Sequence, residues 1–308
     1  MTSSSLDDLA SVTVTLNPDL GVLSLQLSLL QPCSRKILVD NGSSKDVLAS
    51  LVDFKNRFDG VELIELDSNM GLPFALNWGI SHVLASGDER FVLLLDQDSE
   101  PAAGSVQRLA EAYAVISEKA GAKVGAVGPM LQDPDTGLSH GFHVLKSFRW
   151  TRVFPSRDAP PVRCASINGS GTYMSLDAWR CLGGLDEELF IDHVDTEWSF
   201  RLLASGYSLW GIPSAVFVHR MGTEGVRFWF FGWKVWPVRS ALRIRYLFRN
   251  AVILMRRRYV PVVWKVSAVV KLFMTFVVSA IFGPWRINQL RAMLRGIVDG
   301  MFGRSGAL

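Results

Sequence analysis

Two carboxylates separated by one residue follow directly after an apolar run. The run is Phe91–Leu95, and the carboxylates are Asp96 and Asp98 in the stretch DQDSEP. A continuous apolar run of this length is typical of a strand that is buried on both faces of a parallel sheet. Two negative charges at its end are costly unless a cation lies between them. Asp96 and Asp98 are therefore predicted to bind Mg²⁺ or Mn²⁺, which prefer oxygen ligands shared with substrate phosphates. The alternative is that they only begin the next helix.

A second group of acidic residues lies in FIDHVDTEWSFR, residues 190–201. As a helix, this stretch places Asp192 and Asp195 on one face. Asp195 is flanked by bulky apolar residues and is the preferred functional carboxylate. Asp192 could simply favour the dipole of the first helical turn. Glu197 is expected to pair with Arg201 one turn later, which is a structural role.

The elements that would position these residues alternate along the chain. Strands are expected at 11–16, 35–40, 61–66, 90–95, 123–131 and 208–219, and helices at 20–30, 71–86 and 192–206. Such alternation predicts a mostly parallel sheet covered by helices on both faces. Ligands bind outside the carboxyl ends of strands in these sheets. Asp40, Asp67, Asp96 and Asp98 lie at or just beyond the ends of three strands, so we expect them to gather at one edge. His219 is also placed at a strand end, although a lone histidine is more often structural than a ligand.

Charge is divided unevenly along the chain. Residues 1–219 hold 16 Lys and Arg against 27 Asp and Glu, and residues 220–308 hold 16 against two, of 32 and 29 in total. The basic part is rich in Trp and aliphatic residues, and its longest uncharged stretch in the second apolar segment, 272–285, contains Gly283 and Pro284. A membrane span needs ~20 apolar residues, so helices lying in a membrane interface are predicted. A helical subdomain, an oligomer interface or nucleic-acid binding are the alternatives.

Three cysteines without a CxxC pair argue against a disulfide framework and a structural zinc site, and they fit a reducing cytosol. The beginning, MTSSSLDDLA, is polar and acidic and is expected to be a frayed tail rather than a secretory signal. No G-x-G-x-x-G follows the first strand, which disfavours a dinucleotide-binding oxidoreductase.

With these motifs in order, the chain resembles a family 2 glycosyltransferase and, within it, the bacterial rhamnosyltransferases. The resemblance covers roughly residues 11–222 and continues more loosely into RYLFRNAVILMRR at 245–257. It is carried by TLNPD, VDNGSS, SNMGLPFALNWGI, LLLDQDSEP, GGLDEELFIDHVDTEWSFRLLASGY and VHRMG, which occur in the order of the family. DQDSEP and FIDHVDTEW resemble rhamnosyltransferases more than the family at large.

The resemblance implies a GT-A fold, an α/β fold whose mostly parallel nucleotide-binding sheet is flanked by helices and followed by a basic, amphipathic helical region. The expected divisions are a disordered tail at 1–10, a GT-A domain at 11–225 with a nucleotide-binding half (11–131) and an acceptor-binding half (132–225), and a helical membrane-surface region at 226–308.

The resemblance also implies roles for single residues. The nucleoside would be held by Thr15, Asp40 and Asn69, and the metal, ribose and pyrophosphate by Asp96, Asp98 and His219. Asp195 matches the general base, and Trp198 is counted among the substrate-binding residues as well as an anchor of its helix. The family commonly has an acid immediately before the base, where this chain has Val194. The choice of Asp195 over Asp192 therefore depends on counting back from Arg201.

The implied reaction is an inverting, metal-dependent transfer of L-rhamnose from dTDP-rhamnose to a hydroxyl of a lipid-linked glycan in bacterial surface polysaccharide (O-antigen) synthesis. A metal stabilises the leaving diphosphate by several kcal/mol, and a carboxylate takes the proton of the attacking hydroxyl. The implied partners are the sugar nucleotide, the lipid-linked acceptor and the anionic inner face of the cell membrane, with no nucleic acid and an oligomer allowed. The alternatives are a UDP-sugar donor or an inactive sugar-nucleotide- or lipid-binding protein.

Overall fold

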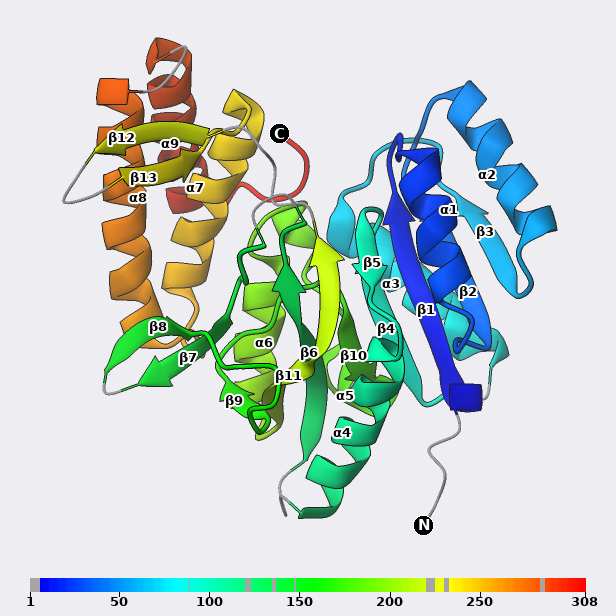
Figure 1. The fold of residues 1–308 in the computed structure, drawn as a ribbon. Helices are drawn as coiled ribbons and strands as arrows, with labels where there is room; N and C mark the ends of the chain where they lie inside the picture. The colour runs from blue at the N-terminus through cyan, green and yellow to red at the C-terminus, as the bar shows by residue number, and fades with distance from the viewer. Residues whose placement is uncertain are drawn as a thin grey trace.

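A mixed, mostly parallel sheet forms the centre of the molecule (Figure 1). The computed structural model describes residues 6–87, 89–119, 123–134, 137–146, 148–219, 225–229, 233–282 and 286–308. The strands of the sheet are β1 (Leu9–Thr15), β2 (Arg35–Asp40), β3 (Val61–Glu65), β4 (Phe91–Asp96), β5 (Ser99–Pro101), β6 (Val124–Gln132), β9 (Val162–Cys164), β10 (Thr172–Ser175) and β11 (Ser208–His219). Their order is β3-β2-β1-β4-β10-β6-β11-β5, and β9 also pairs with β11.

The sheet consists of two parallel parts joined by one reversed strand. The pairs β1–β2, β2–β3 and β1–β4 are parallel, as is β6–β11. Strand β10 lies antiparallel between β4 and β6, and β5 and β9 run antiparallel to β11. The predicted α/β class with a mostly parallel sheet is confirmed. The carboxyl ends of β1, β2, β4, β6 and β11 therefore lie at one edge of the sheet.

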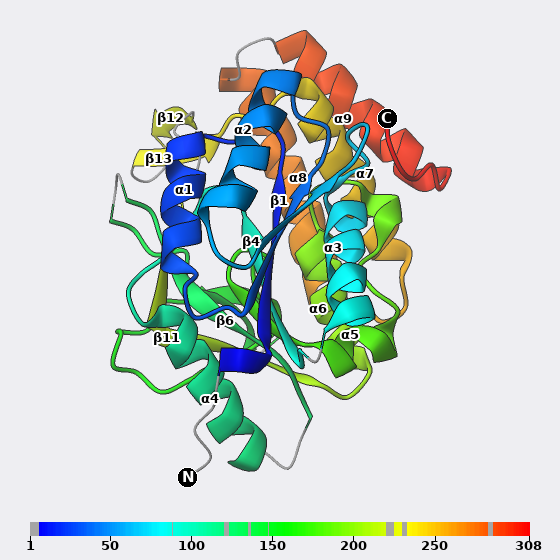
Figure 2. The same cartoon turned by 90° about the vertical axis from the view of Figure 1, so that its right-hand side faces the viewer.

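Helices cover both faces of the sheet, as Figure 2 shows for α3 and α5 on one side and α1 and α4 on the other. The helices are α1 (Leu20–Leu29), α2 (Lys45–Arg57), α3 (Leu72–Ser86), α4 (Ser105–Lys119), α5 (Leu176–Leu182) and α6 (Val194–Ala204), with short 3-10 turns at Leu6–Asp8 and Glu187–Leu189. Alternate residues of β4 serve the two faces: Val92 and Leu94 join the core under α3, and Leu93 and Leu95 join the core under α4. Burying such a side chain fully stabilises the fold by roughly 1.5–3 kcal/mol.

The first strand begins earlier than we expected. Residues 9 and 10 were placed in a disordered tail, but Leu9 and Ala10 belong to β1 and have no exposed surface. The alternating stretch SVTVTL indicated a strand only from residue 11. The structure extends the strand because Leu9 and Ala10 pack into the cores on the two opposite faces of the sheet. Residues 1–5 of the predicted tail lie outside the described residues.

Two small ribbons and three helices complete the chain. The ribbons are β7 (Phe142–Lys146) with β8 (Arg149–Val153) and β12 (Gly225–Trp229) with β13 (Trp233–Pro237), and the helices are α7 (Ala241–Arg256), α8 (Val262–Phe282) and α9 (Arg286–Met301). Helix α9 lies very close to α7, since a Cβ at Gly296 would be 2.5 Å from the carbonyl oxygen of Arg245, and one at Gly300 would be 2.6 Å from that of Arg249. Contacts 245–296 and 249–300 show that the two helices run in the same direction.

Helix α8 is the one helix among the described residues that is long and apolar enough to cross a membrane, judged by length and composition alone. From the sequence we did not predict a membrane span here, because charged residues interrupt the apolar stretches of this region. The helix nevertheless runs unbroken through Lys265 and Lys271. Its apolar surface is largely outward, because Val262, Val270 and Phe273 each expose more than half of their area.

Candidate active site

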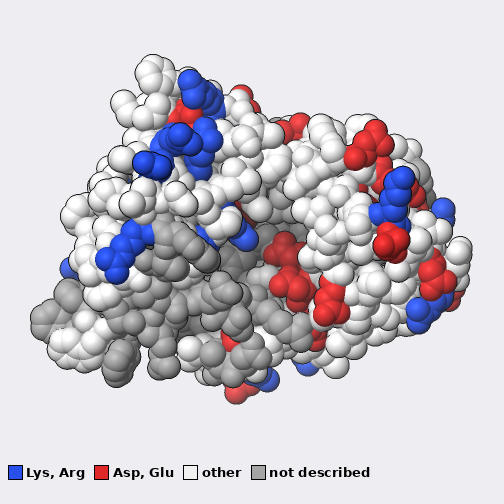
Figure 3. All heavy atoms as spheres, turned by 90° about the horizontal axis from the view of Figure 1, so that it is seen from above, with Lys and Arg blue, Asp and Glu red and all other residues white. Residues whose placement is uncertain are grey.

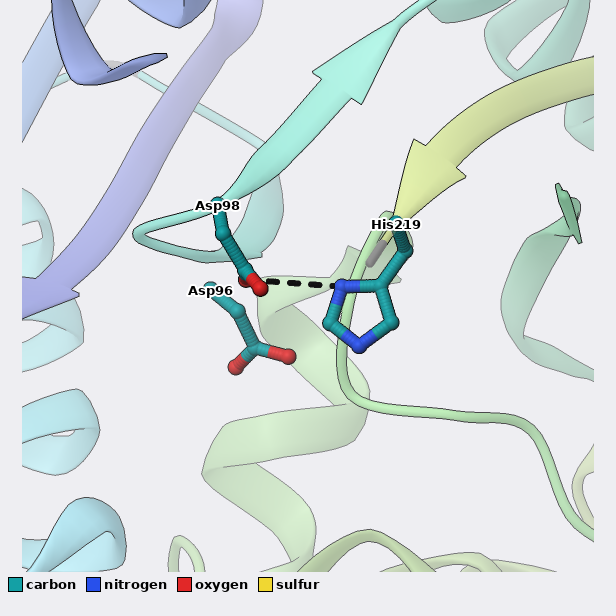
Figure 4. A group of neighbouring side chains, drawn as sticks. All are labelled: Asp96, Asp98 and His219. Carbon is teal, nitrogen blue, oxygen red and sulfur yellow. Dashed lines mark ion pairs between the residues drawn. The ribbon is translucent and has the colours of Figure 1, made fainter. Parts of the chain in front are cut away.

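Asp96, Asp98 and His219 meet at the carboxyl edge of the sheet (Figure 4). The short strand β5 pairs antiparallel with the end of β11, and Ser99 lies opposite His219 in that pair. Asp98 is thereby brought beside His219, with 3.4 Å between its Oδ1 and the ring Nδ1. One ligand atom from each of the three residues lies within 4.8 Å of the others. The structure thus brings together the three residues that the sequence predicted as metal ligands.

The charges of this group call for a cation. Burial raises the pKa of Asp96 above its usual range, and Asp98 adds to this, although His219 acts in the opposite direction. Burial would lower the pKa of His219, but contact with Asp98 and the charge of Asp96 raise it overall. Two carboxylates and an imidazole are a donor set that suits Mn²⁺ or Mg²⁺. The residues present therefore fit a divalent cation.

A buried amide from α1 holds the loop that carries the two aspartates. Gln26 has no exposed surface, and its Nε2 donates to the carbonyl oxygens of Asp96 (2.8 Å) and Ser99 (2.7 Å). Its Oε1 accepts a hydrogen bond from the hydroxyl of Thr13 at 3.0 Å. We did not identify Gln26 from the sequence. The available signal was a lone amide within the apolar helical stretch LGVLSLQLSLL.

Asp195 lies in the first turn of α6 and faces the same edge. Its Oδ1 accepts a hydrogen bond of 2.7 Å from the amide of Thr196. A Cβ added to Gly169 would be 4.0 Å from the Cβ of Asp195, so the loop that leads into β10 passes beside it. Burial, with a further contribution from the charge of Asp96, raises the pKa of Asp195 to about 6. A carboxylate with such a pKa is suited to take a proton near neutral pH.

Helix α6 starts later than we expected, and this changes the role of Asp192. The helix begins at Val194, and Phe190, Asp192 and His193 all have positive φ, between 61° and 65°. Asp192 therefore lies before the first helical turn, and the prediction that it belongs to that turn is wrong. Its carboxylate instead pairs with Arg243 of α7, with 3.3 Å between Oδ2 and Nε.

The predicted pair of Glu197 and Arg201 is present, with 2.9 Å between Oε1 and Nε. Glu197 has no exposed surface and also accepts from the hydroxyl of Tyr259 at 2.5 Å. Trp198 is only 3% exposed and packs in the core under α3. The predicted anchoring role of Trp198 fits this position, which leaves little of its surface for the predicted contact with a substrate.

The predicted nucleoside residues lie at the ends of β1 and β2 and in the loop after β3. The hydroxyl of Thr15 donates to Oδ1 of Asp40 at 3.1 Å, and both residues are buried. Asp40 also accepts from the amide of Ser43 at 2.9 Å, which shapes the loop after β2. Asn69 is exposed, and its Oδ1 accepts from Asn41 (3.1 Å) and from the amide of Gly71 (3.0 Å). Asn69 is thus the member of this set that offers surface to a ligand.

The face at this edge is hollowed near its middle (Figure 3). Acidic side chains gather on the wall that belongs to the N-terminal half of the chain, and basic side chains lie across the hollow on the side of the C-terminal helices. The uneven charge of the sequence therefore places opposite signs on the two sides of the cleft. Such an arrangement suits a ligand that carries phosphate, whose charge the basic side and a cation held by the acidic side could both neutralise.

Comparisons with known proteins agree with this geometry. Residues 34–119 match the glycosyl transferase family 2. The dTDP-rhamnosyl transferase RfbF of Shigella flexneri is 29% identical over 301 residues, which cover 96% of this chain and 96% of the relative. An N-acetylglucosaminyl-diphospho-decaprenol L-rhamnosyltransferase of Mycobacterium tuberculosis is 26% identical over 242 residues, covering 69% of this chain and 76% of the relative.

Solved structures with the same fold are more distant in sequence. The mannosyltransferase PcManGT from Pyrobaculum calidifontis, in complex with GDP-Man and Mn²⁺, has a TM-score of 0.58 at 15% identity, and the match covers 96% of this chain and 88% of that one. GalNAc-T7 with UDP, GalNAc and Mn²⁺ also has a TM-score of 0.58, at 17% identity, and this chain spans 56% of its length. These likenesses show the fold and confirm the predicted GT-A architecture.

Proposed function

Since this chain is a glycosyltransferase of family 2, we propose that it transfers L-rhamnose from dTDP-rhamnose to a hydroxyl of a lipid-linked glycan, with inversion at the anomeric carbon. The observation that carries the proposal is the meeting of Asp96, Asp98 and His219 with a raised-pKa carboxylate, Asp195, at one edge of the sheet. The two rhamnosyltransferase relatives support the choice of sugar.

Each residue of this group has a distinct task in the proposed reaction. Asp96, Asp98 and His219 would hold Mg²⁺ or Mn²⁺, which supplies positive charge to a departing diphosphate. Asn69, exposed beside the loop that Asp40 shapes, would contact the nucleoside. Asp195 would take the proton of the acceptor hydroxyl, a contribution of roughly 10²–10⁴-fold in rate. Attack from the face opposite the leaving group inverts the anomeric centre.

We further propose that the C-terminal region holds the enzyme at the inner face of the cell membrane. Residues 11–225 would form the catalytic domain and residues 226–308 the membrane-surface region. The support is the outward apolar face of α8 together with the excess of basic residues after His219. An acceptor whose glycan is attached to lipid would meet the hollow from that side.

The experiment that tests the proposed reaction is a donor panel. Purified protein is incubated with dTDP-rhamnose, dTDP-glucose, UDP-glucose or UDP-N-acetylglucosamine, with a lipid-linked acceptor, and with Mn²⁺ or EDTA. We expect release of dTDP from dTDP-rhamnose that requires metal and acceptor and is lost in Asp195→Asn. Faster turnover of a UDP-sugar would overturn the sugar, and binding without turnover of any donor would favour the inactive binding protein.

A further inference from the structure

The loop between the 3-10 turn at Glu187–Leu189 and α6 is held by two consecutive residues of α7. We propose that Arg249 and Asn250 are positioning residues for Asp195: they fix the turn Phe190–His193, three residues of which have positive φ, from which α6 starts. The inference rests on the proposed role of Asp195 as the base. It also gives a role to the RN of RYLFRNAVILMRR, which the reaction itself does not use.

Asn250 is fully buried, and its side-chain amide donates hydrogen bonds to carbonyl groups in and beside the turn. Its Nδ2 lies 2.8 Å from the carbonyl oxygen of Leu189, 2.7 Å from that of Ile191 and 3.0 Å from that of Asp192. Two N–H groups thus contact three acceptors within four consecutive residues. A side chain that contacts three carbonyl groups so close in sequence sets the path of the backbone between them.

Arg249 is also fully buried and orients Asn250 while it contacts the same loop. Its Nε donates to Oδ1 of Asn250 at 2.9 Å, which fixes the amide with Nδ2 toward the turn. Its NH2 donates to the carbonyl oxygens of Glu188 (3.1 Å) and Leu189 (3.0 Å). Its guanidinium carbon also lies 4.8 Å from the ring centre of Tyr246. Its NH1 donates to the carbonyl oxygen of Gly306 at 2.6 Å. The carbonyl groups of the loop therefore supply part of the hydrogen bonding that offsets the loss of water by this buried cation.

The turn needs such support because its backbone is strained. Phe190, Asp192 and His193 adopt φ of 61°, 64° and 65° without being glycine. Each such residue costs of the order of 1–3 kcal/mol, and the conformation persists only where the surroundings impose it. On the opposite side, the carbonyl oxygen of Phe190 accepts from the amide of Leu72 at 2.7 Å. The turn is therefore wedged between α3 and α7.

The strained turn decides where Asp195 points. Val194 is the first residue of α6 and Asp195 the second, so the path of the turn sets the direction of the first helical turn. A second contact keeps the helix in place: Glu197 accepts from Tyr259 at 2.5 Å and lies 3.2 Å from NH1 of Arg257. If the turn relaxed, α6 would remain attached through Glu197 while its first residues moved. A displacement of about 1 Å of a catalytic group costs on the order of 10²-fold in rate.

The test compares Asn250→Asp with a matched substitution on the same helix. Asn250→Asp keeps the shape but turns an oxygen toward three carbonyl groups, and Arg249→Lys removes the fork that orients the amide. The control is Phe248→Leu, a buried α7 residue that packs against α9 rather than the turn. With the full chain, we expect kcat to fall at least about 10-fold in both loop variants and to stay within about 2-fold in Phe248→Leu. The affinity for dTDP with Mn²⁺ should change by less than about 2-fold in all three.

A double-mutant cycle and hydrogen exchange separate positioning from loss of stability. In Asp195→Asn, adding Asn250→Asp should cause no further loss of turnover, since the base is already absent. Amides of residues 188–193 should exchange faster in Asn250→Asp and unchanged in Phe248→Leu. Wild-type kcat in folded Asn250→Asp, or an equal loss with and without Asp195, overturns the inference. If the wild-type protein turns over no donor, the proposed function fails instead. In that case, unchanged hydrogen exchange of residues 188–193 in Asn250→Asp would still show that Asn250 does not hold the turn.

Discussion

Replacing Asp195 with Asn should stabilise the fold while it abolishes turnover. The pKa of Asp195 rises from 3.8 to about 6 because the carboxyl is buried and because Asp96 lies nearby. At 1.36 kcal/mol per pH unit, this difference means that the ionised carboxylate costs the folded state up to about 3 kcal/mol. The amide of Asn has no charge to bury, and its oxygen can still accept the hydrogen bond from Thr196.

The sign follows from proton binding in the two states. Between about pH 4 and pH 6 the folded protein holds the Asp195 proton and the unfolded chain does not, so the free energy of unfolding decreases as the pH rises through this window. Above about pH 6 the full cost is present in the wild type and absent in Asp195→Asn. We therefore expect the variant to gain up to about 3 kcal/mol at pH 8 and almost nothing at pH 4.

The assay is urea denaturation of both proteins at pH 4, 6 and 8 in EDTA, with turnover measured on the same samples after Mn²⁺ is restored. Turnover should fall by ~10²-fold or more. Asp192→Asn is the matched control: it loses the pair with Arg243, so it should show no gain in stability and a much smaller loss of turnover. The reasoning is refuted if Asp195→Asn is less stable than the wild type at pH 8, or if its gain is the same at pH 4. A dead Asp192→Asn beside an active Asp195→Asn would move the base to Asp192.

Three further predictions follow from the metal group, its loop and the C-terminal helices. Asp98→Asn should abolish Mn²⁺-dependent binding of dTDP-rhamnose in calorimetry without lowering the melting temperature, and unchanged affinity would exclude Asp98 as a ligand. Gln26→Glu should turn an acceptor toward the carbonyl groups of Asp96 and Ser99 and cost roughly 1–3 kcal/mol with weaker Mn²⁺ binding, whereas wild-type values would show that the amide is dispensable. The protein should sediment with anionic vesicles more than with neutral ones and be released by high salt. Equal binding to both would reject the electrostatic part, and resistance to salt and alkali would indicate that α8 crosses the bilayer.

Much of the fold could be predicted because it follows from local pattern. Apolar runs such as Phe91–Leu95 and the helical stripes between them predict parallel strands and covering helices. Strand β10 could not be placed in this way: TYMS carries no sign that it runs antiparallel between β4 and β6, since that position depends on contacts distant in sequence. The predicted helix start at Asp192 was wrong for a related reason, because the strained turn is imposed by α7.

The meeting of Asp96, Asp98 and His219 could be predicted because each lies at or just beyond the end of a strand, and the ends of parallel strands share one edge of the sheet. The residues that hold the site in place were missed. Gln26 lies in an apolar helical stretch, and Arg249 and Asn250 lie in a basic one that the sequence places at a surface. Only the burial of these three side chains in the structure shows their role. Trp198 was predicted both to anchor its helix and to contact a substrate, and the packing of α6 places it in the core.

The close crossing of α9 over α7 has a consequence for the interpretation of genetic variation in this enzyme. A Cβ added to Gly300 would lie 2.6 Å from the backbone carbonyl oxygen of Arg249, so one added methyl group would push against the residue that we propose holds the turn before α6. A loss-of-function variant such as Gly300→Ala lies in the basic C-terminal helices. Its loss of function could therefore be attributed to failed membrane binding. Under the proposed roles of the turn and of the C-terminal helices, the geometry predicts a different defect: the variant would still bind the membrane but would turn over its donor slowly. Fractionation of cells alongside an assay of the recovered enzyme would tell the two defects apart.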